Sequence, residues 1–396
     1  MVKPSLLISY LCSRALSVLA LQTMATAIVL RALKLGAGPW ELGQLGLAAT
    51  LASLATSLPL GQLVDQMDRR VSILVAHLGL ILLAVSFVFL KSPNFLSLII
   101  LSGLIASFRN FRSISQFAVF GEILSGLPKP EKWINLSTLS WQIAAFAAPI
   151  LASAIDVRWG GQACFMTAAA FFALAFLCQT KIVPALNSVR QKAEAAPVHE
   201  LVSFFYRNEK LRSALLLDFV VVLFAGSTAI LPFLHPNQSG SFEVGLLRSA
   251  LPCGVMLGTI LVLRKPLTGD WKKWLFIATF GFGLSHFLLS LSPLLIISYL
   301  LLIVAGLFDA VSLSVREVLL QVETPQRIKG RVYSLNNFLV NASDELSEWE
   351  SGVAAYGFGL KRSLQLGAGV TMLAAGYFGV KQLKTSIPSS EAVSPA

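Results

Sequence analysis

Long apolar segments alternate with short polar connections along nearly the whole chain. A helix that crosses a bilayer needs about 20 mostly apolar residues, and twelve segments have roughly that length and character. In chain order these segments are 5–33, 42–60, 71–90, 95–120, 136–155, 162–182, 211–234, 243–263, 274–291, 293–314, 332–358 and 364–383. The pattern predicts an all-α integral membrane protein with twelve transmembrane helices.

A polar stretch over 184–210 separates the first six apolar segments from the last six. It is too short to bury a core of its own, so we interpret it as a linker. The predicted organisation is an N-terminal six-helix bundle over 1–183, the linker over 184–210, a C-terminal six-helix bundle over 211–384 and a disordered tail over 385–396. Two sets of six helices suggest an internal duplication and therefore two pseudo-symmetric bundles.

The composition agrees with a membrane protein. Of 396 residues, 55% are apolar and 13% are charged, whereas soluble domains carry about 25% charged residues. The net charge of +11 does not indicate nucleic-acid binding, because most basic residues flank the apolar segments and form no continuous basic face. Most of them fall on the side of the N-terminus, so we expect the linker and both termini to be cytoplasmic.

Ionisable residues inside the apolar segments are rare. Each one costs about 2.5–3.5 kcal/mol at the centre of a spanning helix, so it needs a protein or water environment. The main series occupies the first, fourth, seventh and tenth segments, with one further arginine in the eighth. These residues are Arg14, Arg109, Arg112, Asp218, Asp309 and, outside the series, Arg248. A recurrence at every third segment is typical of halves built from three-helix units.

The eleventh segment carries an acidic and amide-rich face. At 100° per residue, four of its polar residues fall within about 60° of one another. They are Asn337, Asn341, Asp344 and Glu348, with Glu345 at the border. In the fourth segment, Arg109, Arg112 and Gln116 share a face in the same way. We expect the basic face of the first half to confront the acidic face of the second.

Two interpretations of these charges remain open. They can pair with one another and only hold the halves together, or they can handle substrate and protons directly. Both can hold, since a pair that breaks when a ligand or proton arrives can drive a switch between two states.

The connection between the second and third segments has a distinctive spacing of charges. Gly61, Asp65, Arg69 and Arg70 resemble the major facilitator superfamily signature G-x-x-x-D-x-x-G-R-R/K, with Asp68 in place of the second glycine. This resemblance implies the major facilitator fold, in which the first helix of each three-helix unit lines a central cavity and the third faces lipid. It also implies a gating role for these four residues. The equivalent stretch after Gly258 in the second half lacks the aspartate, so only the first half has both the acidic and the basic residues of this motif.

Further stretches resemble one bacterial branch of that superfamily, the enterobactin-exporter-like transporters. Arg14 and Ser17 are similar to its R-x-x-S motif, and Thr324–Val332 resembles T-P-x-x-x-x-G-R-V, which adds Gly330 and Arg331 to the gating candidates. Gly245–Ala250 resembles the opening G-x-L-x-x-A of the eighth helix. The resemblance implies a location in the bacterial inner membrane.

Motifs for other activities are absent from the sequence. There is no phosphate-binding G-x-x-x-x-G-K-[ST], no H-E-x-x-H and no G-x-S-x-G, and the four cysteines and four histidines are dispersed. We therefore predict that the chain is not an enzyme and needs neither a cofactor nor a metal ion.

The sequence as a whole predicts a secondary active transporter that works by alternating access. Its predicted activity is proton-coupled export of a small amphipathic or anionic organic molecule, siderophore or drug-like, by a monomer that needs only the substrate, protons and the bilayer as partners. The alternatives are an importer or lysolipid flippase of the same fold and, from other classes, a non-transporting membrane receptor or an intramembrane enzyme.

Arginine suits an anionic substrate group, and burial between helices favours a protonated carboxyl group at Asp344 and Glu348. The substrate-binding candidates are Arg14, Arg109, Arg112, Gln116, Asn337 and Asn341. The proton-coupling candidates are Asp344, Glu348, Asp218 and Asp309. The gating candidates are Gly61, Asp65, Arg69, Arg70, Gly330 and Arg331.

Overall fold

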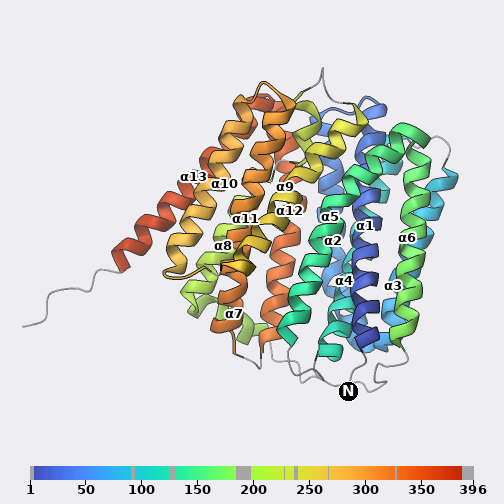
Figure 1. Cartoon of the computed structure of the whole chain (residues 1–396), viewed down its shortest axis with the longest axis horizontal. Helices are drawn as coiled ribbons and strands as arrows, with labels where there is room; N and C mark the ends of the chain where they lie inside the picture. The colour runs from blue at the N-terminus through green and yellow to red at the C-terminus, as the bar shows by residue number, and fades with distance from the viewer. Residues whose placement is uncertain are drawn as a thin grey trace, which may run out of the picture.

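The structure is a computed structural model in which long helices lie side by side (Figure 1). It describes residues 4–90, 94–124, 130–183, 198–226, 228–235, 240–265, 267–325 and 328–385. Every regular element among these residues is a helix. The all-α prediction is therefore confirmed.

Among the described residues, the first half of the chain contributes six helices, and the second half contributes six long helices and two short ones. The first six are α1 (Pro4–Lys34), α2 (Pro39–Gln66), α3 (Arg69–Phe89), α4 (Phe95–Leu124), α5 (Pro130–Trp159) and α6 (Gly161–Ile182). The others are α7 (Val198–Arg207), α8 (Glu209–Ala225), the 3-10 helix η2 (Thr228–Phe233), α9 (Ser241–Arg264), α10 (Trp271–Leu291), α11 (Leu295–Glu323), α12 (Lys329–Phe358) and α13 (Leu360–Thr385).

Nine helices in the described part of the chain are long and apolar enough to cross a membrane. The long helices outside this group are α2, α12 and α13. Two of them, α2 and α12, pack against each other across the two halves, where polar residues are covered by protein. The count of twelve spans stays a prediction.

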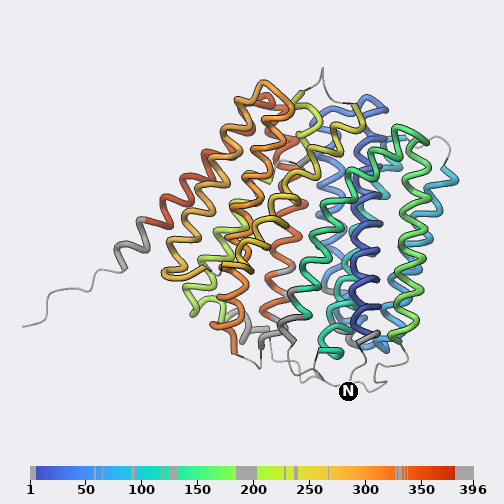
Figure 2. The backbone as a smooth tube through the Cα atoms, in the orientation of Figure 1, coloured from blue at the N-terminus to red at the C-terminus, as the bar shows by residue number. Residues whose placement is uncertain are grey.

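Each half has its own apolar core. In the N-terminal half it includes Leu80, Leu101 and Phe172; in the C-terminal half it includes Leu211 and Leu319. Figure 2 shows the blue-to-green half beside the yellow-to-red half, with the N-terminus at the lower end of the molecule. We call the face on which α1 begins the N-face and the opposite face the distal face.

The outer helices carry exposed apolar side chains. Examples are Leu78 and Leu82 on α3, Leu174 on α6, and Leu373 and Tyr377 on α13. A surface of this kind is suited to lipid, because hydrocarbon tails accept apolar side chains without cost. The predicted lipid-facing role fits these three helices.

The structure moves several predicted helix ends, two of them further than the others. The tenth predicted segment stopped at Ser314, but α11 continues to Glu323 and so includes Arg316. The seventh predicted segment ran to Leu234, but α8 ends at Ala225 and η2 follows. Apolar content indicates only the part of a helix that contacts lipid. It therefore does not predict where a helix continues into polar residues or breaks near its end.

The predicted charged loop between the second and third segments is mostly helical. Gly61 lies in the last turns of α2, and Arg69 and Arg70 begin α3, so only Met67 and Asp68 connect the two helices. The Asp68 carboxylate caps α3 by accepting the backbone N–H of Arg70 at 2.8 Å. This cap explains an aspartate at the position where the family motif has glycine.

Part of the predicted linker is also helical. Residues 198–207 form α7, and Phe204 and Phe205 of this helix pack on the core of the C-terminal half. The remainder of the linker, 184–197, and nearly all of the predicted tail, 386–396, lie outside the described residues. The division into two bundles at this linker stays a prediction.

Candidate functional site

The two halves approach each other closely near the distal face. A Cβ atom added to Gly352 of α12 would lie 2.7 Å from the Cα atom of Gly43 in α2, and one added to Gly46 would lie 2.6 Å from the Cβ atom of Glu348. In a second seam, Gly245 of α9 packs directly on Ser153 and Pro149 of α5. Small residues thus allow backbone-to-backbone contact between the halves at this end.

A cavity of about 350 Å³ lies between the halves. Its described lining comes from α1, α2, α4 and α5 on one side and from α8 to α12 with η2 on the other; α3, α6 and α13 contribute none of it. The charged residues of the lining are Arg109, Arg248, Asp309, Asp344, Glu345 and Glu348. Most of the remaining lining residues are apolar, as is usual for a small-molecule site.

Helix α10 departs from the predicted pattern. As the third helix of its unit it was expected to face lipid, but Phe282 and His286 line the cavity. The His286 ring is buried, and its Nδ1 atom lies 3.0 Å from the carbonyl oxygen of Phe282. One face of α10 therefore closes the cavity while the other remains apolar and exposed.

An ion pair crosses the cavity from one half to the other. The guanidinium group of Arg109 on α4 is paired with the carboxylate of Glu345 on α12. The Glu345 side chain is only 6% exposed and that of Arg109 is 32% exposed, so water screens the pair weakly. The basic face of the fourth helix and the acidic face of the eleventh spanning segment thus meet at this point.

Further carboxylates surround this pair. The negative charges of Asp344 and Glu348 also act on Arg109, and Glu348 acts on Arg248. Asp344 is itself close enough to feel the like charges of Asp309, Asp218 and Glu348. Neighbouring carboxylates in a space of low dielectric constant favour sharing a proton. The described lining of the cavity therefore combines two arginines with four carboxyl groups.

Asp218 differs from the other predicted proton carriers because it does not line the cavity. Its carboxylate is paired with Arg316 of α11, and both side chains are 5% exposed. This pair lies entirely within the C-terminal half, so its geometry suits a structural link between α8 and α11. Arg316 was not among the predicted site residues, because it lies beyond the predicted end of the tenth segment at residue 314.

Three predicted substrate-binding residues form a separate group on the N-face side of Arg109. Arg112 donates through Nη1 to Oε1 of Gln116 at 2.6 Å. Arg14 of α1 is hydrogen-bonded to the hydroxyl of Tyr10. None of the three belongs to the described cavity lining. Asn341 lies on α12 and makes a contact of its own, and the side chain of Asn337 is outside the described residues.

The gating candidates lie near the N-face. Arg69 at the start of α3 is paired with Glu122 at the end of α4, at 2.8 Å between Nη1 and Oε2. Gly61 has open space where a Cβ atom would lie. The side chains of Asp65 and Arg331, and the surroundings of Gly330, are outside the described residues. Their gating roles stay predictions.

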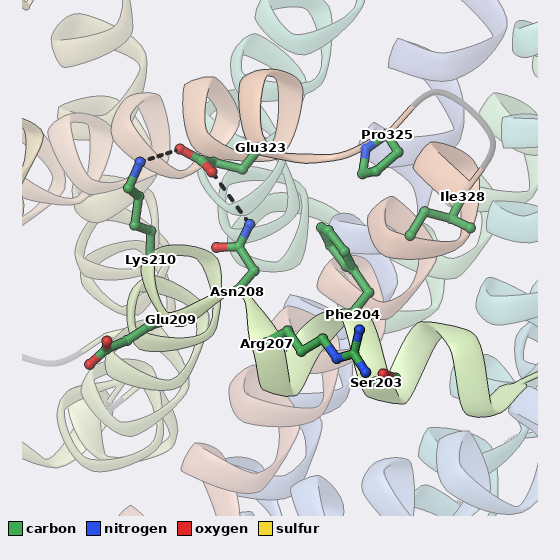
Figure 3. Close-up of a pocket in the computed structure, with 9 residues that line it drawn as sticks. All are labelled: Ser203, Phe204, Arg207, Asn208, Glu209, Lys210, Glu323, Pro325 and Ile328. Carbon is green, nitrogen blue, oxygen red and sulfur yellow. Dashed lines mark hydrogen bonds and ion pairs between the residues drawn. The ribbon is translucent and has the colours of Figure 1, made fainter.

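A second pocket, of about 680 Å³, opens at the N-face beside α7 (Figure 3). Glu323 accepts from Lys210 at 2.8 Å and from Asn208 at 3.4 Å, and Phe204 points toward Pro325. All of its described lining comes from the second half of the chain. The smaller central cavity is the better candidate site, because it joins the two halves and collects the charges that are costly in a membrane.

Arg248 was noted only as a charge inside the eighth segment and was not among the predicted site residues, and Glu345 had only a border position. Both signals were present, since Arg248 is a charge inside an apolar segment and Glu345 adjoins Asp344. Which acidic residue contacts Arg109 depends on how α12 is rotated about its own axis relative to α4. The sequence pattern does not specify this rotation.

Comparison with known families agrees with this architecture. The sequence model described as Major Facilitator Superfamily matches residues 6–343. The chain belongs to the major facilitator superfamily. Members of this family are transporters, so the protein is a multi-pass membrane transporter and not an enzyme.

Curated relatives of this family member include enterobactin exporters. The enterobactin exporter EntS of Shigella boydii is 24% identical over 334 residues, which cover 82% of this chain and 79% of the relative. The enterobactin exporter EntS of Escherichia coli O81 is 23% identical over 334 residues, with the same coverage of 82% and 79%. The predicted resemblance to this branch is confirmed.

Solved structures share the fold at low identity. A bacterial homolog to the human lysosomal transporter Spinster, in an inward-facing conformation, gives a TM-score of 0.73 at 14% identity and covers 98% of this chain and 100% of that chain. A D-xylose–proton symporter gives a TM-score of 0.72 at 13% identity, with 99% and 98% covered. These similarities place the chain in the major facilitator fold.

Proposed function

We propose that the protein exposes its central cavity alternately to the two sides of the membrane and exports a small amphipathic or anionic organic molecule, driven by the proton gradient. The observation that carries this proposal is the Arg109–Glu345 ion pair, which links the two halves inside the cavity. A ligand that competes for either charge changes the contact between the halves. Such differential binding is what drives a change of conformational state.

Proton coupling is assigned to the carboxyl groups of the cavity. Asp344 is exposed and lines the cavity from α12 together with Glu348, and Asp309 lines the cavity from α11. Protonation of Asp344 or Glu348 weakens the attraction that Arg109 and Arg248 exert on α12. The proton and the substrate would thus act on the same contact, which couples their movements.

The relatives named enterobactin exporters support a siderophore or another catechol-like molecule as the substrate. The apolar cavity wall suits an aromatic body, and the arginines suit anionic oxygens. In the proposed orientation the N-face is cytoplasmic, both termini lie on that side, and the monomer works in the bacterial inner membrane. The basic residues that flank the apolar segments support this orientation.

The deciding experiment is transport in proteoliposomes with a catecholate siderophore as the probe. The wild-type protein should catalyse counterflow, and a pH gradient should accelerate net flux. Glu348→Gln should keep counterflow but lose the response to the gradient, because a neutral amide cannot exchange a proton. Glu350→Gln is the matched control: it lies on the same helix, outside the cavity lining, and should behave as wild type.

The other outcomes assign the alternatives. Binding of the siderophore without counterflow would make the protein a receptor. Net flux toward the N-face side would make it an importer. An unchanged gradient response in Glu348→Gln would remove this residue from proton coupling.

A further inference from the structure

Two arginines converge in the N-terminal half with no carboxylate beside them among the described residues. Arg112 is 7% exposed. The charges that act on it come from Arg14 and Arg109, together with the hydroxyl of Tyr10, and His77 is a further neighbour. Of these three arginines, Arg109 alone forms an ion pair with a described carboxylate, that of Glu345. The remaining pair, the half-buried Arg14 and the buried Arg112, therefore holds positive charge without a negative counterpart among the described residues.

The polar atoms around this pair are donors that lack acceptors. The buried side-chain atoms that have no hydrogen-bond partner within the described part of the chain include four from these residues and the adjoining turn of α4: Nε of Arg14, Nε of Arg112, Oγ of Ser115 and Nε2 of Gln116. Ser115 is fully buried and Gln116 is 3% exposed. Buried polar groups are normally satisfied, and arginine cannot relieve the charge by losing its proton. Donors concentrated in this way suit a group that is negative and accepts hydrogen bonds.

This group is separate from the acidic cavity. Arg112 lies three residues beyond Arg109, about 4.5 Å further along α4 toward the N-face. The described lining of the cavity includes Arg109 but neither Arg14 nor Arg112. Arg14 is only half-buried, so the pair keeps some accessible surface. The basic and acidic groups therefore occupy successive levels of the molecule.

We propose that Arg14, Arg112 and Gln116 form a binding site for a small anion or anionic group. The ligand is either a free inorganic anion or a carboxylate-like or catecholate-like group of the transported molecule. The second source rests on the proposed transport function, whereas the site itself does not. In either case bound negative charge neutralises two arginines that otherwise repel each other across the interface of α1 and α4.

The site can be tested without transport, by thermal unfolding of the purified full-length protein. We expect a transition temperature several degrees higher in sodium chloride than in sodium gluconate at equal ionic strength, since a ligand of the folded state stabilises it. Arg112→Gln and Arg14→Gln should each lose this difference. Arg158→Gln should keep it, because Arg158 is exposed at the end of α5 and lies over Trp159.

Two independent arginine variants keep the test valid when one of them does not fold. If Arg112→Gln fails to fold, Arg14→Gln carries the test, because the half-buried Arg14 tolerates an amide more readily. A chloride effect that persists in folded Arg14→Gln overturns the proposal. So does a wild-type protein whose stability is indifferent to chloride, acetate and phosphate alike.

Flux measurements then separate the two sources of the anion. Competition between chloride and the siderophore assigns the site to the anionic group of the substrate. A requirement for chloride assigns it to a free ion. A protein that shows arginine-dependent stabilisation by chloride but no counterflow retains the anion site and loses the proposed transport function, so the two failures are distinguishable.

Discussion

At the scale of single residues, the contact between Arg109 and Glu345 is the most consequential. Removing one partner of a buried ion pair costs about 3–5 kcal/mol, because the other charge stays buried alone. We therefore expect Arg109→Gln and Glu345→Gln each to lower the unfolding temperature and to abolish flux. The double variant should recover most of the stability, since no charge is left unpaired, but not the flux. Thermal unfolding and counterflow on the four proteins make up the double-mutant cycle.

The Asp218–Arg316 pair provides a reference within one half. It is more deeply buried than the Arg109–Glu345 pair and does not cross between the halves. Neutralising Asp218 alone should also lower stability. If the Arg109–Glu345 double variant transports like the wild type, then the Arg109–Glu345 pair only holds the two halves together in the resting state and takes no part in substrate handling.

At the scale of elements, glycine positions decide how closely α2 and α12 can pack. A Cβ atom on Gly352 would lie 2.6 Å from the carbonyl oxygen of Pro39 and 2.7 Å from the Cα atom of Gly43, both backbone atoms that cannot move aside. Gly352→Ala should therefore separate the distal ends of the two helices. Overpacking costs about 1–3 kcal/mol, which corresponds to a shift of about 5–150-fold in the equilibrium between distal-closed and distal-open states.

Gly369→Ala on α13 is the matched control for that substitution. No atom lies within 4 Å of the Cβ position of Gly369, and alanine favours a helix over glycine. This variant should keep the wild-type equilibrium, measured as protection of the α2–α12 seam in hydrogen exchange. Equal protection in Gly352→Ala and Gly369→Ala would mean that the seam tolerates a methyl group and does not set the equilibrium.

The elements also show what a sequence can predict here. Bilayer thickness imposes a length on apolar segments, so the positions of α1 to α6 and α8 to α13 could be predicted closely. The ends were wrong where helices continue into polar sequence, as at Gln66 and Glu323. Arg109, Asp309, Asp344 and Glu348 could be found because charges are costly in a membrane. The pairing of Arg109 with Glu345 depends on how helices rotate against each other, which no pattern along one segment specifies.

At the scale of the whole molecule, the two distal seams determine from which side the cavity can be reached. Ala49 of α2 lines the cavity, below the glycine contacts at Gly43 and Gly46. With the native cysteines replaced by serine, a cysteine at this position should react with a membrane-impermeant thiol reagent added on the N-face side. It should resist the same reagent added on the distal side, because the close contacts of α2 with α12 and of α5 with α9 block the path.

Combining the reporter with the seam variant tests alternating access directly. In Gly352→Ala, Ala49→Cys should become reactive from the distal side as well, since the distal ends of α2 and α12 can no longer meet. Adding the siderophore or a pH gradient to the wild-type background should change the ratio of the two labelling rates, because both act on the Arg109–Glu345 contact between the halves. A tag on the N-terminus identifies the side to which the N-face belongs. Equal labelling from both sides in the wild-type background would mean that the seams do not close the cavity, and the ion pair could not then act as a gate.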